Sequence, residues 1–186
     1  MPSTRNAIRT KSLAARAPSP RRQPRSESVV RTVPEVPLWA RPGFLVRRLH
    51  QVHYALFFEE CAAFDITPVQ YGMLTALSNS PDLDQNSIGR ELGIDRTNVA
   101  DVLNRLAKRG LVERRRSKQD KRMMLARLTR EGERVTSGMY ASMLHAQERL
   151  LEPLLPAERK SFMTMLTRLV DGNNHLGRTI FKPNKA

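Results

Sequence analysis

Apolar residues recur at intervals of three and four positions over most of the chain beyond residue 41, which is the spacing of one buried helix face. Two short stretches, 111–116 and 123–128, instead read as strands joined by a tight basic loop. The pattern therefore predicts a mainly α protein with a small two-stranded β wing. The predicted helices cover 42–64, 68–77, 85–92, 96–108, 130–151 and 156–170.

The order of these elements between Asp84 and Leu125 is the most informative pattern in the chain. A short helix is followed by Gly93, and glycine tolerates the positive φ of a tight turn. A second helix then begins after Asp95, a residue type that caps helix N-termini well. Helix, turn, helix, strand, loop and strand in this order indicate a winged helix-turn-helix, which places one helix in a DNA major groove.

The second helix of this pair presents polar residues opposite its apolar positions. Arginine can read guanine, asparagine can read adenine, and threonine can contact a thymine methyl group or a phosphate. Long basic side chains on the wing can enter a minor groove or follow phosphates. A merely solvated charged face is the alternative, and the ordered elements favour DNA contact. The predicted DNA-binding residues are Arg96, Thr97, Asn98, Asp101, Arg105, Arg116, Lys118, Lys121 and Arg122.

One acidic residue, Asp120, stands among the basic residues of the wing tip. It is not expected to face DNA. We expect it to orient the Arg122 side chain through a charge-assisted hydrogen bond.

Composition narrows the class of partner. The net charge of +14 favours a polyanion. Aromatic residues make up only 5%, too few for a platform that stacks single-stranded bases. No apolar run spans a membrane and no secretory signal is recognisable. The single cysteine, Cys61, excludes an internal disulfide framework and fits a reducing cytoplasm.

Catalytic and metal chemistry find no support in the sequence. There is no phosphate loop, nucleophile elbow or glycine-rich dinucleotide motif. The four histidines and one cysteine lack the spacing of metal ligands. We therefore expect a protein that is not an enzyme and that carries no cofactor or metal.

The composition also divides the chain. Residues 1–37 hold eight basic residues against two acidic ones, many prolines and no apolar period, so we interpret them as a disordered basic tail. This tail is either a DNA-binding arm or a solubilising segment, and the sequence leaves both open. The expected domain covers 42–175, with the DNA-binding lobe at 66–129, and 176–186 form a C-terminal tail.

Two stretches resemble a known family. ITPVQYGMLTAL (66–77) and IGRELGIDRTNVADVLNRLAKRGLVERRRSKQDKRMMLARLTREG (88–132) are similar to the MarR family of bacterial transcription regulators. The resemblance covers about 42–174. One departure is Ser117-Lys118-Gln119, where the family often has a proline before the acidic residue. RPGFLVRRLHQVHYALFFEEC and PVQYGMLTAL further resemble regulators of nicotinate-type catabolism within this family.

The resemblance implies a homodimer built from the first, fifth and sixth helices, so that 42–64 and 130–175 would be dimerisation helices. It also implies binding to palindromic promoter DNA and release by a small ligand, often an aromatic acid. A ligand cleft is implied between the first helix, the second helix and the wing domain.

Polar residues of the first helix suit such a cleft. His50, His53 and Phe57 lie three and four residues apart and so share one helix face. Charge at the rim and apolar walls would accept a small aromatic carboxylate. Alternatively, these polar groups hydrogen-bond across the dimer. The predicted ligand-binding residues are Arg47, His50, His53, Tyr54, Tyr71 and Met73.

The sequence thus predicts a sequence-specific regulator that binds double-stranded DNA, as a homodimeric repressor released by a small aromatic acid such as a nicotinate derivative. The alternative is an architectural protein that coats DNA through its charge and has no ligand switch. A membrane-surface protein is a third possibility, against which the basic tail's lack of an amphipathic period counts.

Overall fold

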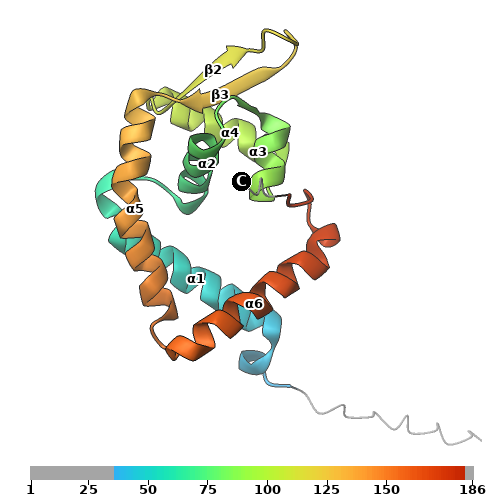
Figure 1. Ribbon diagram of the computed structural model, residues 1–186. Coiled ribbons are helices and arrows are strands. Elements are labelled where there is room, and N and C mark those ends of the chain that lie inside the picture. The colour runs from blue at the N-terminus through green and yellow to red at the C-terminus, as the bar shows by residue number, and fades with distance from the viewer. Residues whose placement is uncertain (1–35, 183–186) are drawn as a thin grey trace, which may run out of the picture. The chain divides into compact units, whose positions relative to one another are not determined.

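A computed structural model describes residues 36–182 (Figure 1). Residues 1–35 and 183–186 lie outside the described part, and with them almost all of the expected basic tail. The elements are η1 (Leu38–Ala40), α1 (Pro42–Glu60), η2 (Ala62–Phe64), α2 (Pro68–Asn79), β1 (Leu83–Asp84), α3 (Gln85–Leu92), α4 (Arg96–Lys108), β2 (Val112–Arg116), β3 (Met124–Leu128), α5 (Arg130–Leu151), α6 (Pro156–Asn173) and η3 (Asn174–Leu176).

Local capping explains why several predicted helix starts are confirmed. The Thr67 hydroxyl accepts the Gln70 N–H at 3.2 Å, and the Gln70 side chain accepts the Thr67 N–H at 2.9 Å, so that two free donors of α2 are satisfied together. The Asp95 carboxylate caps α4, and the Thr129 hydroxyl caps α5 by accepting the N–H of Gly132 at 3.0 Å.

The first helix is shorter than predicted. It ends at Glu60, and the apolar residues that follow belong to η2 instead. Asp65 then adopts a left-handed conformation with φ of 51°, which no α-helix continues through. Periodicity alone did not show this end because Phe64 still packs against the core.

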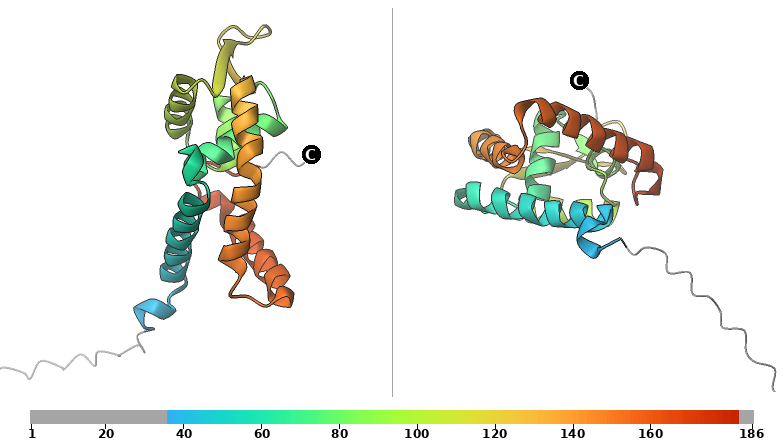
Figure 2. Two further views of the ribbon diagram at one scale, coloured as in Figure 1. Left: turned by 90° about the vertical axis from the view of Figure 1, so that its left-hand side faces the viewer. Right: turned by 90° about the horizontal axis from the view of Figure 1, so that it is seen from below.

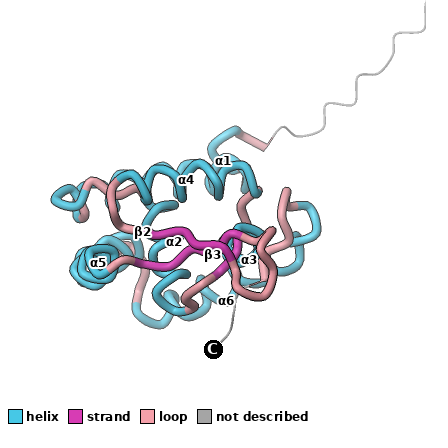
Figure 3. Tube along the Cα trace, turned by 90° about the horizontal axis from the view of Figure 1, so that it is seen from above, coloured by secondary structure: helices cyan, strands magenta, loops and turns pink. Residues whose placement is uncertain are grey.

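The wing belongs to a sheet of three strands rather than two. Its strands β2 and β3 lie side by side (Figure 3). The strand order is β1-β3-β2 and both pairings are antiparallel. Leu83 of β1 pairs with Ala126, and Val112 of β2 pairs with Leu128. A strand of only two residues has no alternation that a sequence pattern could show, which is why β1 was missed.

The core lies where α2, α3, α4 and the sheet meet, and α1 and α5 add residues from one side. Leu103 and Leu106 of α4 pack there with Ile88 of α3 and Leu74 of α2, each at most 1% exposed. Burying one such side chain contributes roughly 1.5–3 kcal/mol. The apolar faces predicted for α2 and α4 are therefore confirmed.

Helix α5 is joined tightly to the lobe at its first turn and then runs beside α1 (Figures 1 and 2). A Cβ atom on Gly132 would lie 2.0 Å from the Leu111 carbonyl oxygen, so only glycine permits this approach. The Thr129 N–H donates to the same carbonyl at 3.0 Å. Further along, Arg149 donates to Glu60 at 2.5 Å, which fastens α5 to α1.

Candidate DNA-binding surface and ligand cavity

Helix α4 has one buried and one exposed face, as a reading helix requires. Val99, Leu103 and Leu106 are no more than 1% exposed. The residues exposed on the opposite face are polar. They include Arg96, Thr97, Asn98, Asp101 and Arg105, the five residues of this helix that the sequence predicts to bind DNA.

Asn98 is held by the residue that caps its helix. Its side-chain amide donates to one carboxylate oxygen of Asp95 at 2.7 Å, and its backbone N–H donates to the other at 3.0 Å. The amide is thereby fixed at the first turn of α4, where a recognition helix meets base edges. A bidentate contact with adenine uses the side-chain oxygen and one amide N–H, and the second N–H can keep its bond to Asp95.

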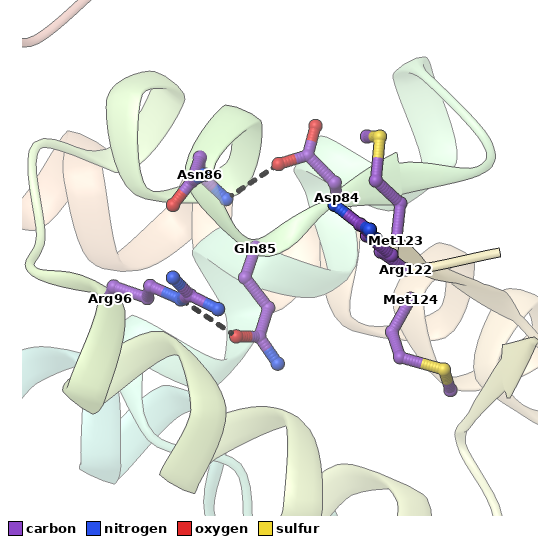
Figure 4. Close-up of a pocket in the computed structure, with 7 residues that line it drawn as sticks. All are labelled: Asp84, Gln85, Asn86, Arg96, Arg122, Met123 and Met124. Atoms are coloured by element: carbon purple, nitrogen blue, oxygen red, sulfur yellow. Dashed lines mark hydrogen bonds between the residues drawn. The ribbon is translucent and has the colours of Figure 1, made fainter. Parts of the chain in front are cut away.

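The reading helix and the wing meet at a small cavity of about 220 Å³ (Figure 4). Arg96 of α4 and Arg122 of the wing both line it, and the Arg96 guanidinium donates to the Gln85 side chain at 3.5 Å. Gln85 and Asn86 begin α3 directly after its cap, Asp84. The Asp84 carboxylate also lines the cavity and already accepts the N–H groups of Asn86 and Ser87, so a phosphate here would be bound by the two arginines rather than by the end of α3.

Gln85 and Asn86 were missed by sequence reasoning. Their signal was available, because they are the first two residues after an acidic N-cap in the first helix of a helix-turn-helix.

The wing tip is shaped by backbone contacts. The buried Ser117 hydroxyl accepts the N–H groups of Gln119 and Asp120, each at 3.2 Å. One Asp120 oxygen accepts the backbone N–H of Arg122 at 2.9 Å. The expected pairing of Asp120 with the Arg122 side chain is therefore wrong, because the carboxylate folds back on the chain two residues on, as aspartate does in turns.

This arrangement leaves the basic side chains of the tip available. Within residues 36–182 no ion pair is formed by the Arg122 guanidinium, and that side chain is exposed. Arg116, Lys118 and Lys121 are exposed too.

Two arginines at the wing base are engaged inside the protein instead. Arg115 donates two hydrogen bonds to the Asp82 carboxylate, at 3.0 and 2.6 Å, and Arg114 donates to Asn104 of α4 at 2.7 Å. The hydrogen bond from Arg115 lowers the pKa of Asp82, although burial opposes the shift. These contacts fix the wing relative to the reading helix and to the loop before β1.

A second cavity, of about 340 Å³, lies between α1, α2 and α5. Its walls are mainly apolar, with a few polar groups. The lining residues are His53, Phe57, Pro68, Tyr71, Gly72, Thr75, Met143, Ala146 and Gln147. The size and character are those of a site for a small organic molecule.

The polar groups of this cavity are uncharged near neutral pH. Burial lowers the pKa of His53 below its ordinary 6.5, and the nearby His50 lowers it further. Burial raises the pKa of the Tyr71 hydroxyl, which the neighbouring Thr75 offsets only in part. The buried Thr75 hydroxyl does not reach hydrogen-bonding geometry with any group in the described residues.

Of the six predicted ligand residues, two line this cavity, His53 and Tyr71. The His50 ring packs against the Tyr54 ring at an interplanar angle of 45°, with ring centroids 4.5 Å apart, and Arg47 lies over the Phe44 ring at 5.2 Å.

Met73 is wholly buried in the core, so it does not form the expected cavity wall. Successive helix positions are turned by about 100°, so residues 71 and 73 cannot face one cavity. Sequence reasoning also missed Met143 and Gln147 of α5, which only the tertiary fold brings to α1 and α2.

Residues 36–182 show neither a metal site nor a helix that could cross a membrane. Among these residues, histidine, cysteine and acidic side chains do not gather in any group that could hold a metal ion. In the same part of the chain, every helix is too short or too polar to cross a membrane.

An exposed polar helix face beside a basic wing defines the class: the protein is a winged helix-turn-helix protein that binds DNA. Comparison with known proteins gives the family. The model of the MarR family matches residues 64–123. The chain belongs to the MarR family of transcription regulators, so it is a DNA-binding regulator and not an enzyme.

Solved structures of related regulators cover the described fold. PcaV from Streptomyces coelicolor, in complex with its natural ligand, is 37% identical, with a TM-score of 0.67 over 74% of this chain and 96% of its own. BpsR from Bordetella bronchiseptica, whose DNA binding is regulated by 6-hydroxynicotinic acid, is 26% identical, with a TM-score of 0.70 over 74% and 98%. The repressor CouR, bound to a 23-mer DNA duplex, is 28% identical, with a TM-score of 0.68 over 73% and 99%.

Proposed function

We propose that this regulator is a homodimeric repressor that reads a near-palindromic DNA site with α4 and the wing and is released by a small aromatic carboxylate. The observation that carries the proposal is the combination of a solvent-facing polar face on α4 with a separate, mainly apolar cavity beside α5. One surface can bind DNA while the other binds a ligand.

The reading role rests on chemistry and exposure. Arg96, Thr97 and Asn98 stand on the first turn of α4, the part of a recognition helix that meets base edges. Asp101 and Arg105 follow on the same exposed face. Arg116, Lys118, Lys121 and Arg122 of the wing would neutralise phosphates or enter the minor groove. The repressor CouR, which shares this fold, binds a 23-mer DNA duplex, and this supports duplex DNA as the partner.

The evidence for the proposed dimer is apolar surface that remains exposed in the described chain. Helix α6 buries none of its residues and exposes Met165, Leu169 and Val170. Helix α1 exposes Leu45 and Val46. A second copy that covers these faces would bring two reading helices to half-sites roughly 10–10.5 bp apart on the duplex.

The ligand role rests on the 340 Å³ cavity and on the neighbours that respond to ligands. Phe57 and Met143 supply apolar walls for a ring, and Tyr71 offers a hydroxyl donor. Nicotinate-like acids are the first class to test. Such a ligand must prefer the conformation in which the reading helices miss the groove, since equal affinity for both conformations would shift nothing.

The neutral state of His53 adds a pH dependence. An anionic ligand beside the ring favours its protonated form, so binding should take up a proton. Ligand affinity is therefore expected to rise as pH falls through the pKa that the ring has in the complex, and to level off below the lowered pKa of the free ring.

The experiment is a titration of the operator complex with a panel of aromatic acids. The operator is first selected from random duplexes, and release is followed by fluorescence anisotropy over a series of pH values that starts at neutral pH and extends below the lowered pKa of His53. His53→Ala should lose the response to the active acid. His50→Ala is the matched control, because it removes a histidine outside the cavity and should keep the release by the active acid. If no acid weakens the complex, or both variants respond alike, the ligand assignment is wrong.

The architectural alternative remains testable in the same assay, since the net charge of +14 would support binding to any duplex. Selection that enriches no common site, together with equal affinity for all duplexes, would favour it over a repressor.

A further inference from the structure

The chain does not end at α6 but turns back to the helix-turn-helix. We call residues Asn174–Lys182 the C-terminal strap. The Lys182 N–H donates to the Arg90 carbonyl of α3 at 2.8 Å. The Phe181 side chain lies against the turn between α3 and α4, with its Cβ 3.6 Å from where a Cβ on Gly93 would stand. The strap therefore contacts the turn that sets the angle between these two helices.

The strap has a fixed shape of its own. The Asn174 side chain donates to the Phe181 carbonyl and accepts the Phe181 N–H, both at 2.8 Å. One amide thus satisfies both backbone groups of a residue seven positions away, which closes the segment into a loop anchored at the end of α6. Such a loop transmits position, unlike a free tail, because its ends cannot move apart without breaking both bonds.

The end of α3 and the turn that follows it are suited to contact with the C-terminal strap. The last carbonyls of a helix have no partner within it, and the Lys182 N–H satisfies one of them at Arg90. Gly93 adopts φ of 67° and has no side chain to keep the Phe181 ring away. The glycine that makes the turn possible also provides the surface on which Phe181 rests.

We propose that the strap fixes the helix-turn-helix relative to α6, and that Phe181 and Asn174 are positioning residues for DNA binding. The strap reaches α3 from the side of α6, whereas the wing lies beyond α3 and α4 on the other side (Figure 1). It therefore leaves the exposed face of α4 uncovered and acts through orientation rather than through contact with DNA.

The consequence follows from the geometry of a two-fold complex, so this inference rests on the proposed dimer. Two reading helices must match two half-sites at a set spacing. A second attachment between α6 and each helix-turn-helix narrows the range of spacings that the free dimer samples. Without it, DNA must order the two lobes at a cost in conformational entropy, and affinity falls.

The test uses full-length protein with Phe181→Ala and Asn174→Ala. Phe181→Leu keeps an apolar contact and should retain most of the effect of phenylalanine. Ile180→Ala is the matched control, because Ile180 is the adjacent apolar residue and is 51% exposed. None of these residues belongs to the buried core, so all four variants are expected to fold.

Three readouts separate positioning from general stability. Hydrogen exchange of a peptide spanning the turn at Gly93 should become faster in both alanine variants. Distances between spin labels at Lys108→Cys of the two copies should broaden. Operator affinity should fall roughly 3- to 30-fold, the range of a coupling contact. Dimerisation, measured by ultracentrifugation, should stay unchanged, and Ile180→Ala should match wild type throughout.

Unchanged exchange and label distances in both alanine variants would overturn the proposal, as would operator affinity equal to or above that of wild type. Failure of the wild type to prefer any duplex would contradict the proposed function instead, and exchange at the turn would still decide whether the strap holds it.

Discussion

Helices α4 and α6 carry similar apolar patterns but differ in what covers them. Helix α4 places Val99, Leu103 and Leu106 in the core and shows only polar residues to solvent. Helix α6 buries nothing within the described chain and exposes Leu169 at 60%. An apolar face therefore indicates that a helix packs against another element. It does not indicate whether that element belongs to the same chain or to a partner.

The largest expected effect is a difference in the free energy of unfolding between substitutions in α4 and in α6. Leu103→Ala should lower the free energy of unfolding by roughly 2–5 kcal/mol, because it leaves a cavity in a packed core. Leu169→Ala, which removes the same atoms from an exposed position, should cost less than about 1 kcal/mol when dimer is absent. Urea denaturation at low protein concentration measures both. Equal losses would show that α6 is packed within one chain.

The second effect is on assembly. Leu169→Asp places a charge in the face that we propose is covered by the partner, and should weaken dimerisation by about 2 kcal/mol or more. Thr167→Asp adds the same charge two positions away, on another face of α6, and should leave the dimer intact. Sedimentation equilibrium measures the dimer dissociation constant of each variant. A monomeric wild type at micromolar concentration would contradict the proposed dimer.

The third effect concerns the polar face of α4. Asn98→Ala should cost about 1–3 kcal/mol on the operator and less on random duplex, because a base-reading contact is lost. Arg122→Ala should weaken binding to both duplexes, since the wing contacts phosphates or the minor groove. Anisotropy at fixed salt compares them. Equal losses on the two duplexes for Asn98→Ala would argue against direct reading at this position.

The smallest effect is a pH dependence at the α1–α5 contact. Hydrogen bonds from His145, at 2.8 Å, and then from Arg149 lower the pKa of Glu60 below its ordinary 4.5. The stability contributed by the ionised carboxylate is therefore present above pH 4.5 and lost as pH falls through the lowered value. Glu60→Gln should reduce this acid dependence in denaturation curves. Glu59→Gln, which removes a more exposed carboxylate of the same helix that is bound only to Arg149, is the matched control.

The features predicted correctly from the sequence are those that depend on residues close to one another along the chain. Thr67 and Asp95 cap helices through neighbours three residues away, so the starts of α2 and α4 were predicted correctly. The exposed face of α4 followed from its period alone. Contacts between distant segments were not predictable in this way. Met143 reaches the cavity, and Phe181 reaches Gly93, only after the chain has folded.

Two predictions made from residue type alone, without knowledge of the geometry, were wrong. Asp120 and Arg122 suggested an ion pair, but the backbone of the turn was the nearer donor. Met73 suggested a soft wall for a ligand, but the helical twist from Tyr71 directs it into the core. Periodicity fixes which face a residue occupies, whereas partner and cavity depend on neighbouring elements.

The close approach at Gly132 has a mechanical consequence. Helix α5 begins pressed against the Leu111 carbonyl, at the end of the reading lobe, and 14 residues later Ala146 lines the cavity. At about 1.5 Å per residue these points are about 21 Å apart, so a tilt of about 5° at the cavity displaces the first turn by about 2 Å. That displacement exceeds half the rise of about 3.4 Å between base pairs. Helix α5 would in this way convert a small change of tilt at the cavity into a displacement of the lobe that carries α4.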